Sequence, residues 1–112
     1  MGGGQGAGAG EGAAVSLPVV LRDEAGAEFD EAFDWYDAQR VGLGTAFAAA
    51  VQVVFDCIAA NPLVHGVVLA DIRKAVVRRF PYCVFYRPHA DRVEVIAVFH
   101  TSRDPSIWQR RA

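Results

Sequence analysis

The stretch that decides the fold is IRKAVVRRFPYCVFYRPHADRVEVIAVFH, residues 72–100. β-branched and aromatic residues dominate it, and apolar and polar side chains alternate with a period of two, as in half-buried strands. We expect three successive strands here, over residues 72–80, 81–87 and 93–100. The turn residues PHAD (88–91) place the last two strands in an antiparallel hairpin.

Five arginines lie in this stretch, and three of them, at positions 78, 79 and 87, flank the aromatic run FPYCVFY (80–86). Arginine is almost never fully buried without a partner, so each must lie where a strand meets water or a negatively charged group. Alternation along a strand predicts that Arg78 and Arg79 point to opposite faces of the sheet. We therefore expect at least one of them on an exposed face, available to an anionic partner.

Two helices are predicted before this stretch. The first begins near Asp23, a capping residue, and its apolar residues recur at helical spacing as far as Tyr36. After the turn RVGLG (40–44), a second helix is expected from about residue 45 to 60, ending at Asn61-Pro62. So short a connection predicts an antiparallel helical hairpin. The acidic residues of the first helix mostly fall off its apolar stripe and are interpreted as a solvated face: Glu28, Glu31, Asp34 and Asp37.

The remaining segments complete the predicted fold. A short strand is expected after Pro18 in VSLPVVLR (15–22), residues 62–70 are interpreted as a loop, and Asp104-Pro105 starts a short helix through Trp108. Strands grouped after helices predict an α+β fold. It has an N-terminal strand, an antiparallel helical hairpin packed on one face of a mainly antiparallel sheet, and a short C-terminal helix.

The two ends of the chain differ strongly in charge. Residues 1–72 carry two arginines and ten acidic residues, a net charge of −8, whereas residues 73–112 carry nine basic and three acidic residues, a net charge of +6. The basic part could attract nucleic acid or an acidic protein. Alternatively, it neutralises the acidic part within the same fold.

Composition sets the remaining limits. Seven of the eleven glycines lie in the first twelve residues, so residues 1–14 are interpreted as a disordered glycine-rich lead-in and residues 15–112 as one domain. We expect neither a secretory signal nor an apolar stretch that approaches a membrane span. Cys57 and Cys83 are interpreted as buried free thiols, which fits the cytoplasm. No metal and no cofactor are expected.

Four segments together resemble a known family: DWYDAQRVGLGTAF (34–47), NP (61–62), RKAVVRRFPYCVFY (73–86) and VIAVFHTSRDPSIWQRR (95–111). In this order and spacing they are similar to the RelE/ParE superfamily, the toxins of bacterial type II toxin–antitoxin modules, in the branch labelled plasmid stabilisation proteins. The resemblance spans about residues 15–111.

This resemblance implies a compact α+β fold, growth inhibition in the cytoplasm and a cognate antitoxin that wraps and blocks the toxin. It leaves two modes of action open. RelE-like toxins cleave messenger RNA in the ribosome, whereas ParE-like toxins inhibit DNA gyrase by binding alone. An inactive member that acts only as a partner-binding module is a third alternative.

Cleavage of RNA needs an acid, a base and cations for the charge on the phosphorane. His100 could serve as acid or base, and an arginine could hold phosphate through two parallel bonds. The predicted catalytic set, for the RelE-like alternative only, is His100, Arg79 and Arg103. The nuclease branch often uses a C-terminal tyrosine or a further basic residue, and no tyrosine follows His100. This departure favours a toxin that acts by binding.

A binding toxin needs only a recognition surface. The residues predicted to bind the target or the antitoxin are cations of the basic part and one tryptophan: Arg73, Lys74, Arg78, Arg79, Arg87, Arg103 and Trp108. Structural roles compete with these predictions. Arg73 could hold the helices through Asp34 or Asp37, His100 could pair with Asp104, Arg110 and Arg111 could be a solvated tail, and both tryptophans could serve packing.

Overall fold

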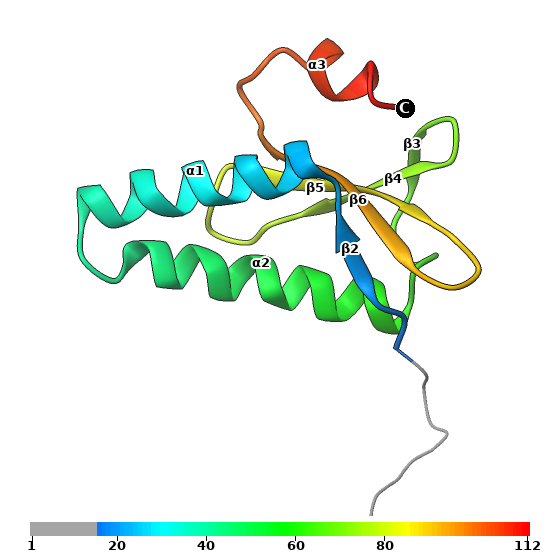
Figure 1. The fold of residues 1–112 in the computed structure, drawn as a ribbon, viewed down its shortest axis with the longest axis horizontal. Coiled ribbons are helices and arrows are strands. Elements are labelled where there is room, and N and C mark those ends of the chain that lie inside the picture. Colours follow the sequence, from blue (N-terminus) through cyan, green and yellow to red (C-terminus); the bar gives the residue numbers. More distant parts are fainter. Residues whose placement is uncertain (1–15) are drawn as a thin grey trace, which may run out of the picture.

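The computed structural model describes residues 16–112, so the predicted lead-in over residues 1–14 lies outside the described part of the chain, and the division into lead-in and domain stays a prediction. Figure 1 shows the elements, whose bounds are β2 Val19–Leu21, α1 Asp23–Gln39, α2 Leu43–Ala60, β3 Val67–Leu69, β4 Ile72–Val76, β5 Tyr82–Pro88, β6 Val93–His100 and α3 Ser106–Gln109.

The five strands form one sheet in the order β2-β6-β5-β4-β3. β2 runs parallel to β6, and the other three neighbouring pairs are antiparallel. Helices α1 and α2 lie side by side as a hairpin, and α3 lies apart from them (Figure 1). The predicted α+β architecture is therefore confirmed.

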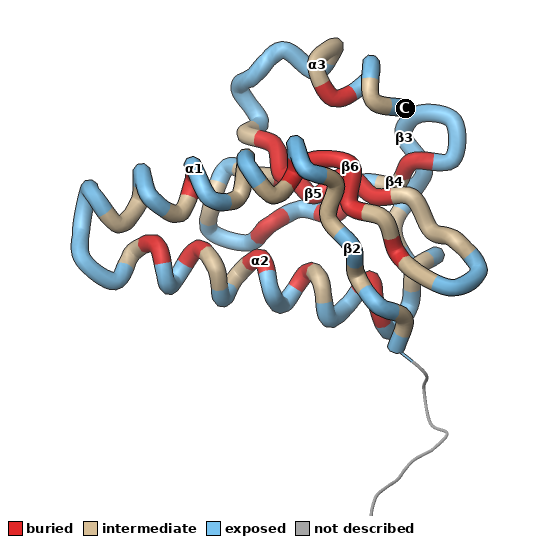
Figure 2. The backbone as a smooth tube through the Cα atoms, viewed as in Figure 1, coloured by how far each residue is buried: buried red, intermediate tan, exposed pale blue. Residues whose placement is uncertain are grey.

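Alternation along β5 divides the core into two apolar clusters. Val84 and Tyr86 belong to a cluster that also contains Phe47, Val51 and Ile58 of α2. Cys83 and Phe85 belong to a second cluster, which α3 completes with Trp108. Each large side chain removed from water contributes about 1.5–3 kcal/mol, so both faces of β5 stabilise the fold. Figure 2 shows the buried segments concentrated in β5, β6 and along α2.

The prediction of an unbroken strand over residues 72–80 is wrong. β4 ends at Val76, and residues 77–81 form a turn in which Arg79 has a φ of +72°. Arg78 and Arg79 therefore do not alternate across the sheet as predicted. Phe80 anchors the turn, because its ring packs edge-on against Tyr36 and Phe47 with centroids 5.0 and 5.3 Å apart.

The predicted loop over residues 62–70 contains a strand. β3 forms the outer edge of the sheet, and all three of its residues are exposed. The alternation of apolar and polar side chains that would identify a half-buried strand is therefore missing. The β3–β4 turn places Ala70 at a φ of +51°.

The connection between the helices depends on Asp37. Its Oδ1 accepts hydrogen bonds from the backbone N–H groups of Gly42 and Gly44, at 3.0 and 3.1 Å. Asp37 thus caps the start of α2 by accepting its free backbone N–H groups, because the N-cap residue Gly42 has no side chain that could accept them. The interpretation of Asp37 as part of a solvated face is wrong.

Helix α2 corrects a further expectation. It has 18 residues with a mean hydropathy of 1.8. By length and composition, the helix is therefore long and apolar enough to span a membrane. The prediction that no stretch approaches a span is therefore wrong. In this fold six residues of α2 are buried, and those from Phe47 to Ile58 belong to the core. A helix in the core of a folded domain can be as long and apolar as a membrane span.

The two cysteines have different surroundings. Cys83 is buried as predicted, and burial raises the pKa of its thiol. Cys57 is exposed, contrary to the prediction, with its Sγ 3.9 Å from Nε2 of His65.

Candidate functional site

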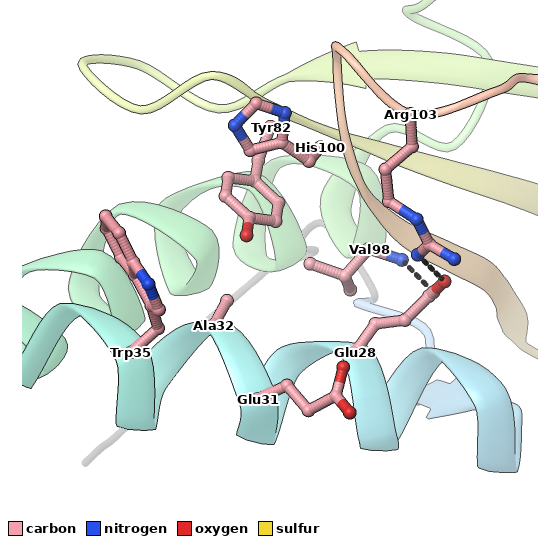
Figure 3. Close-up of a pocket in the computed structure, with 8 residues that line it drawn as sticks. All are labelled: Glu28, Glu31, Ala32, Trp35, Tyr82, Val98, His100 and Arg103. Carbon is pink, nitrogen blue, oxygen red and sulfur yellow. Dashed lines mark hydrogen bonds and ion pairs between the residues drawn. The ribbon is translucent and has the colours of Figure 1, made fainter.

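A groove of about 360 Å³ opens between α1 and the ends of β5 and β6. Figure 3 shows the side chains that line it: Glu28, Glu31, Ala32, Trp35, Tyr82, Val98, His100 and Arg103. Helix α1 supplies the carboxylates and the indole, and the strands and the following loop supply the phenol, the imidazole and the guanidinium. The groove thus combines two predicted residues, His100 and Arg103, with acidic residues that were not predicted to take part.

Glu28 is the most heavily bonded side chain of the groove. Its carboxylate accepts hydrogen bonds from the guanidinium of Arg103 at 2.9 Å and from that of Arg111 at 3.0 Å to each oxygen. It also accepts the backbone N–H of Val98 at 3.1 Å. The side chain is only 9% exposed. The prediction that Glu28 belongs to a solvated face is therefore wrong.

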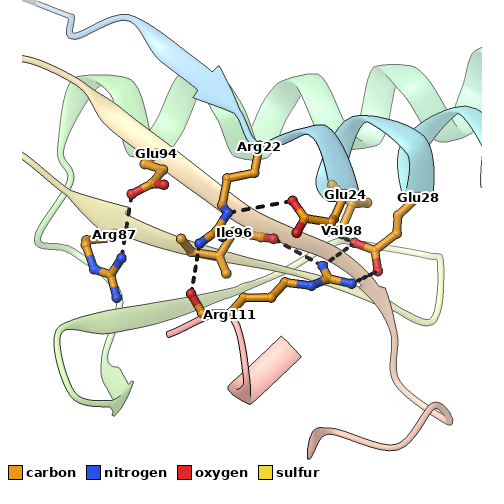
Figure 4. Close-up of polar contacts among 8 residues, drawn as sticks. All are labelled: Arg22, Glu24, Glu28, Arg87, Glu94, Ile96, Val98 and Arg111. Atoms are coloured by element: carbon orange, nitrogen blue, oxygen red, sulfur yellow. Dashed lines mark hydrogen bonds and ion pairs between the residues drawn. The ribbon is translucent and has the colours of Figure 1, made fainter. Parts of the chain in front are cut away.

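Arg111 links the C-terminal segment to the sheet (Figure 4). Besides Glu28, its guanidinium binds the carbonyl of Ile96 at 3.2 Å, and its own carbonyl accepts a bond from Arg22 at 2.8 Å. Its side chain is 13% exposed. The interpretation of Arg111 as a solvated tail is wrong, whereas Arg110 is exposed.

His100 is oriented by the loop that follows it. Its Nδ1 accepts the backbone N–H of Ser102 at 3.0 Å and lies 2.8 Å from the Ser102 hydroxyl. A backbone N–H can only donate, so a neutral imidazole here carries its proton on Nε2. The alternative pairing with Asp104 is not observed, because Asp104 instead accepts the backbone N–H of Ser106 at 3.0 Å. That bond lowers the pKa of Asp104.

Tyr82 faces the groove beside His100, with ring centroids 5.1 Å apart. Burial raises the pKa of its phenol. The phenol therefore stays protonated near neutral pH and can donate a hydrogen bond but cannot act as a base.

Arg78 and Arg79 lie outside the groove, in the exposed turn between β4 and β5. The backbone N–H of Thr101 bonds to the carbonyl of Pro81 at 2.9 Å, so this turn and the loop after His100 meet at the same end of the sheet. Neither arginine has a hydrogen bond or ion pair from its side chain to another residue of the described chain. The structure therefore does not combine Arg79 with His100 and Arg103 in one cavity.

Two other predicted binding arginines are held by the protein itself. Arg73 donates to the carbonyls of Leu63 and His65, at 3.2 and 2.6 Å, and contacts neither Asp34 nor Asp37 as the structural alternative proposed. Arg87 bonds to Asp71 at 2.8 Å and lies 3.7 Å from Glu94. Both side chains therefore stabilise the fold through bonds to other residues of the chain.

The contact between His89 and Glu94 predicts that the fold loses stability in acid. A 3.0 Å hydrogen bond from His89, with help from Arg22 and Arg87, lowers the pKa of Glu94 below its ordinary 4.5. A pKa lowered by folding means that the contact stabilises the fold fully above the ordinary value and is lost as the pH falls through the folded value. We expect up to about 1 kcal/mol from it.

Unfolding in urea, measured from roughly pH 6 to pH 3, checks this expectation. Glu94→Gln should lower stability near pH 6 and flatten the acid decline relative to the natural chain. Glu31→Gln, at an exposed position without a partner in residues 16–112, is the control and should leave the decline unchanged. A Glu94→Gln curve parallel to that of the natural chain would contradict the assignment.

The remaining predicted residues, Lys74 and Trp108, lie near each other on the far side of the sheet. Trp108 is buried and stacks on Phe85 with ring centroids 3.9 Å apart, which supports the packing alternative. Lys74 is exposed, and both residues line a second cleft. Trp35, in contrast, is 60% exposed on α1.

The chemistry of the first groove follows from these contacts. The positive charge of Arg103 is neutralised by Glu28, and Glu31 adds a second carboxylate, so a phosphodiester would meet negative charge on one wall. Within residues 16–112, no group of three or more His, Cys, Asp and Glu side chains could hold a metal ion. His100 is the one imidazole lining the groove.

No sequence signal marked Glu28 and Arg111 as partners, since they lie 83 residues apart and both follow patterns typical of solvated residues. Their pairing depends on the position of α3 relative to α1, which only the tertiary fold determines.

The chain resembles known proteins in both sequence and fold. The sequence model of a family described as "ParE toxin of type II toxin-antitoxin system, parDE" matches residues 19–105, more than half of the chain. A solved structure described as "Chromosomal ParDE TA system from P. aeruginosa" contains a chain that aligns with a TM-score of 0.58 at 14% identity. The alignment covers 78% of this chain and 98% of that one, and at this identity it supports the fold alone. No curated protein sequence matches.

Proposed function

The chain belongs to the ParE toxin family of type II toxin–antitoxin systems, and from this premise we propose that it inhibits growth in the cytoplasm by binding DNA gyrase. A cognate antitoxin neutralises it, and where the gene pair is carried on a plasmid this toxicity stabilises the plasmid. The observation that carries the choice of a binding mode is the internal neutralisation of the groove. Arg103 is bonded to Glu28 rather than left free for phosphate.

The β4–β5 turn is the proposed contact with the target. Arg79 occupies the left-handed region at a φ of +72°, a conformation that costs a non-glycine residue of order 1 kcal/mol or more. Glycine would adopt this conformation without strain, so the arginine at this position is consistent with a need for its side chain. Because Phe80 fixes the turn, Arg78 and Arg79 are presented on a rigid support.

Arg79→Gly tests this role with little effect on the fold. We expect the variant to keep its stability or gain about 0.5–1 kcal/mol, because glycine tolerates the left-handed backbone. Inhibition of gyrase supercoiling by the purified variant should fall at least about tenfold. A tenfold loss corresponds to about 1.4 kcal/mol, which we expect from removing one exposed charge contact with the target. Stability is measured by urea unfolding and inhibition by titration of supercoiling.

Ala70→Gly is the matched control. It relieves the other positive φ of a non-glycine residue, at +51°, without removing a charge. It should gain similar stability and inhibit gyrase as the natural chain does. Full inhibition by Arg79→Gly would show that the arginine has no role in target binding.

The proposed target itself is tested by inducing the chain without an antitoxin and labelling DNA and protein synthesis in parallel. Early failure of DNA synthesis, together with inhibition of gyrase in vitro, is the expected result. Cleaved messages with normal supercoiling would contradict it. Continued growth by cells that contain folded protein would instead identify an inactive member that only binds partners.

One observation favours the ribonuclease alternative. The first groove brings His100, Tyr82 and Arg103 together, with the Nε2 proton of a neutral His100 free to be donated. In that alternative His100→Ala abolishes message cleavage and toxicity while the fold is kept. Toxicity that survives His100→Ala would remove the proposed catalytic role.

A further inference from the structure

The second cleft has a volume of about 280 Å³ and is lined in part by Trp108 and Gln109 of α3. Figure 1 shows α3 on the side of the sheet away from the helical hairpin. β3 and β4 supply Val68 and Lys74, and the centre of the sheet supplies Phe85 and Phe99. His100 and Arg103 close the cleft at the loop before α3. Its size is at the lower end of small-molecule pockets, so it fits single side chains of a docked segment.

The charge of this cleft is one-sided. Lys74, His100 and Arg103 line it, and among the described residues no carboxylate does. This contrasts with the first groove, which two glutamates line and in which Glu28 bonds to Arg103. Lys74 has no ion pair within residues 16–112, so its charge is available to a partner.

The apolar part of the cleft extends onto its rim. Val68 is 47% exposed and lines the cleft. Val76 is 63% exposed, lies opposite Cys83 in the β4–β5 ladder, and shares the face of Lys74 because strand residues two apart point the same way. Exposed valines beside unpaired positive charge are typical of a protein contact rather than a solvated surface.

We propose that this cleft, lined by Val68, Lys74, Phe85, Phe99 and Arg103, together with the exposed Val76 on the same strand face, is the docking site of the antitoxin, and that the segment which fills it is acidic with an aliphatic or aromatic anchor side chain. The inference rests on the proposed neutralisation by an antitoxin. The anchor side chain packs against the exposed Val68 and Val76, and a flanking carboxylate pairs with Lys74, because Arg103 is already bonded to Glu28. Charge complementarity excludes a basic or neutral segment as the preferred occupant.

The experiment measures the affinity of the purified antitoxin for variants of this chain by calorimetry. Lys74→Glu should weaken binding at least about tenfold, because it places like charges opposite each other, and Lys74→Arg should keep the affinity of the natural chain. Val76→Asp should weaken binding to a similar degree. Binding by the natural chain should weaken with added salt more steeply than binding by Lys74→Glu.

Arg40→Glu is the matched control, since it makes the same kind of charge reversal at an exposed position between α1 and α2, outside the cleft. It should bind the antitoxin within about twofold of the natural chain. Affinities of Lys74→Glu and Val76→Asp that match the natural chain would overturn the proposal. Thermal unfolding of each variant verifies that the fold is kept.

The same variants separate this inference from the proposed target. Lys74→Glu should still inhibit gyrase, whereas Arg79→Gly should still bind the antitoxin. Failure of gyrase inhibition by the natural chain would contradict the target and leave the antitoxin result standing. Normal antitoxin binding by Lys74→Glu would contradict the docking site and leave the target standing.

Discussion

Replacing Glu28 by alanine should lower the free energy of unfolding by about 3 kcal/mol. The change leaves the guanidinium of Arg111, which is 13% exposed, without its carboxylate. It also removes the acceptor of the Val98 N–H and one partner of Arg103. A partly buried charge that loses its partner retains the cost of its desolvation, so the loss exceeds that of an ordinary surface ion pair.

Urea unfolding of the purified variant measures this loss. Glu31→Ala is the matched control, one turn along the same helix, because Glu31 is exposed and has no hydrogen bond or ion pair in the described part of the chain. It should change stability by no more than about 0.5 kcal/mol. Equal losses in the two variants would show that helix propensity, and not the contacts of Glu28, determines the result.

A double-mutant cycle isolates the pair. Arg111→Met keeps part of the apolar stem while removing the charge, and on its own it should destabilise the fold. In combination with Glu28→Ala, the total loss should be clearly smaller than the sum of the two single losses, because the second change removes a charge that is already unpaired. Additive losses would contradict a direct energetic link between α1 and the C-terminal segment.

Much of the fold follows from periodicity. The β-branched and aromatic runs on either side of the turn residues PHAD predicted the β5–β6 hairpin, and the apolar stripes predicted α1 and α2 close to their observed bounds. The helices were predictable because each buries one face, which imposes a regular spacing, and the strands because such apolar runs are bounded by turn residues. The start of α3 followed from Asp104-Pro105 for the local reason that proline has no N–H to satisfy at a helix start.

The errors have equally physical causes. β3 is exposed along its whole length, so burial imposes no alternation on it. The turn at residues 77–81 contains Arg79 where a glycine would have marked a positive φ, so its residues fit a continuous strand. Glu28 and Arg111 look solvated locally and become a partly buried pair only when the segment after α3 reaches α1. Contacts between residues so far apart in the sequence do not affect the local spacing of apolar and polar residues, so this spacing could not predict them.

Gly44→Ala should lower the free energy of unfolding by about 2 kcal/mol. A Cβ at this position would lie 2.7 Å from the carbonyl oxygen of Phe33 and 3.0 Å from Cβ of Asp37, both on α1. The carbonyl belongs to a helix backbone and cannot move aside alone, so α1 and α2 must separate. This strain outweighs the gain of about 1 kcal/mol that alanine normally brings within a helix.

Gly26→Ala is the matched control within α1, because the same change there meets no atom within 4 Å. It should raise the free energy of unfolding by about 0.5–1 kcal/mol through helix propensity and the reduced entropy of the unfolded chain. The two variants are thus expected to change stability in opposite directions in urea unfolding. A gain in both would contradict the close crossing of the helices at Gly44, and with it the backbone contact that positions Asp37 over the start of α2.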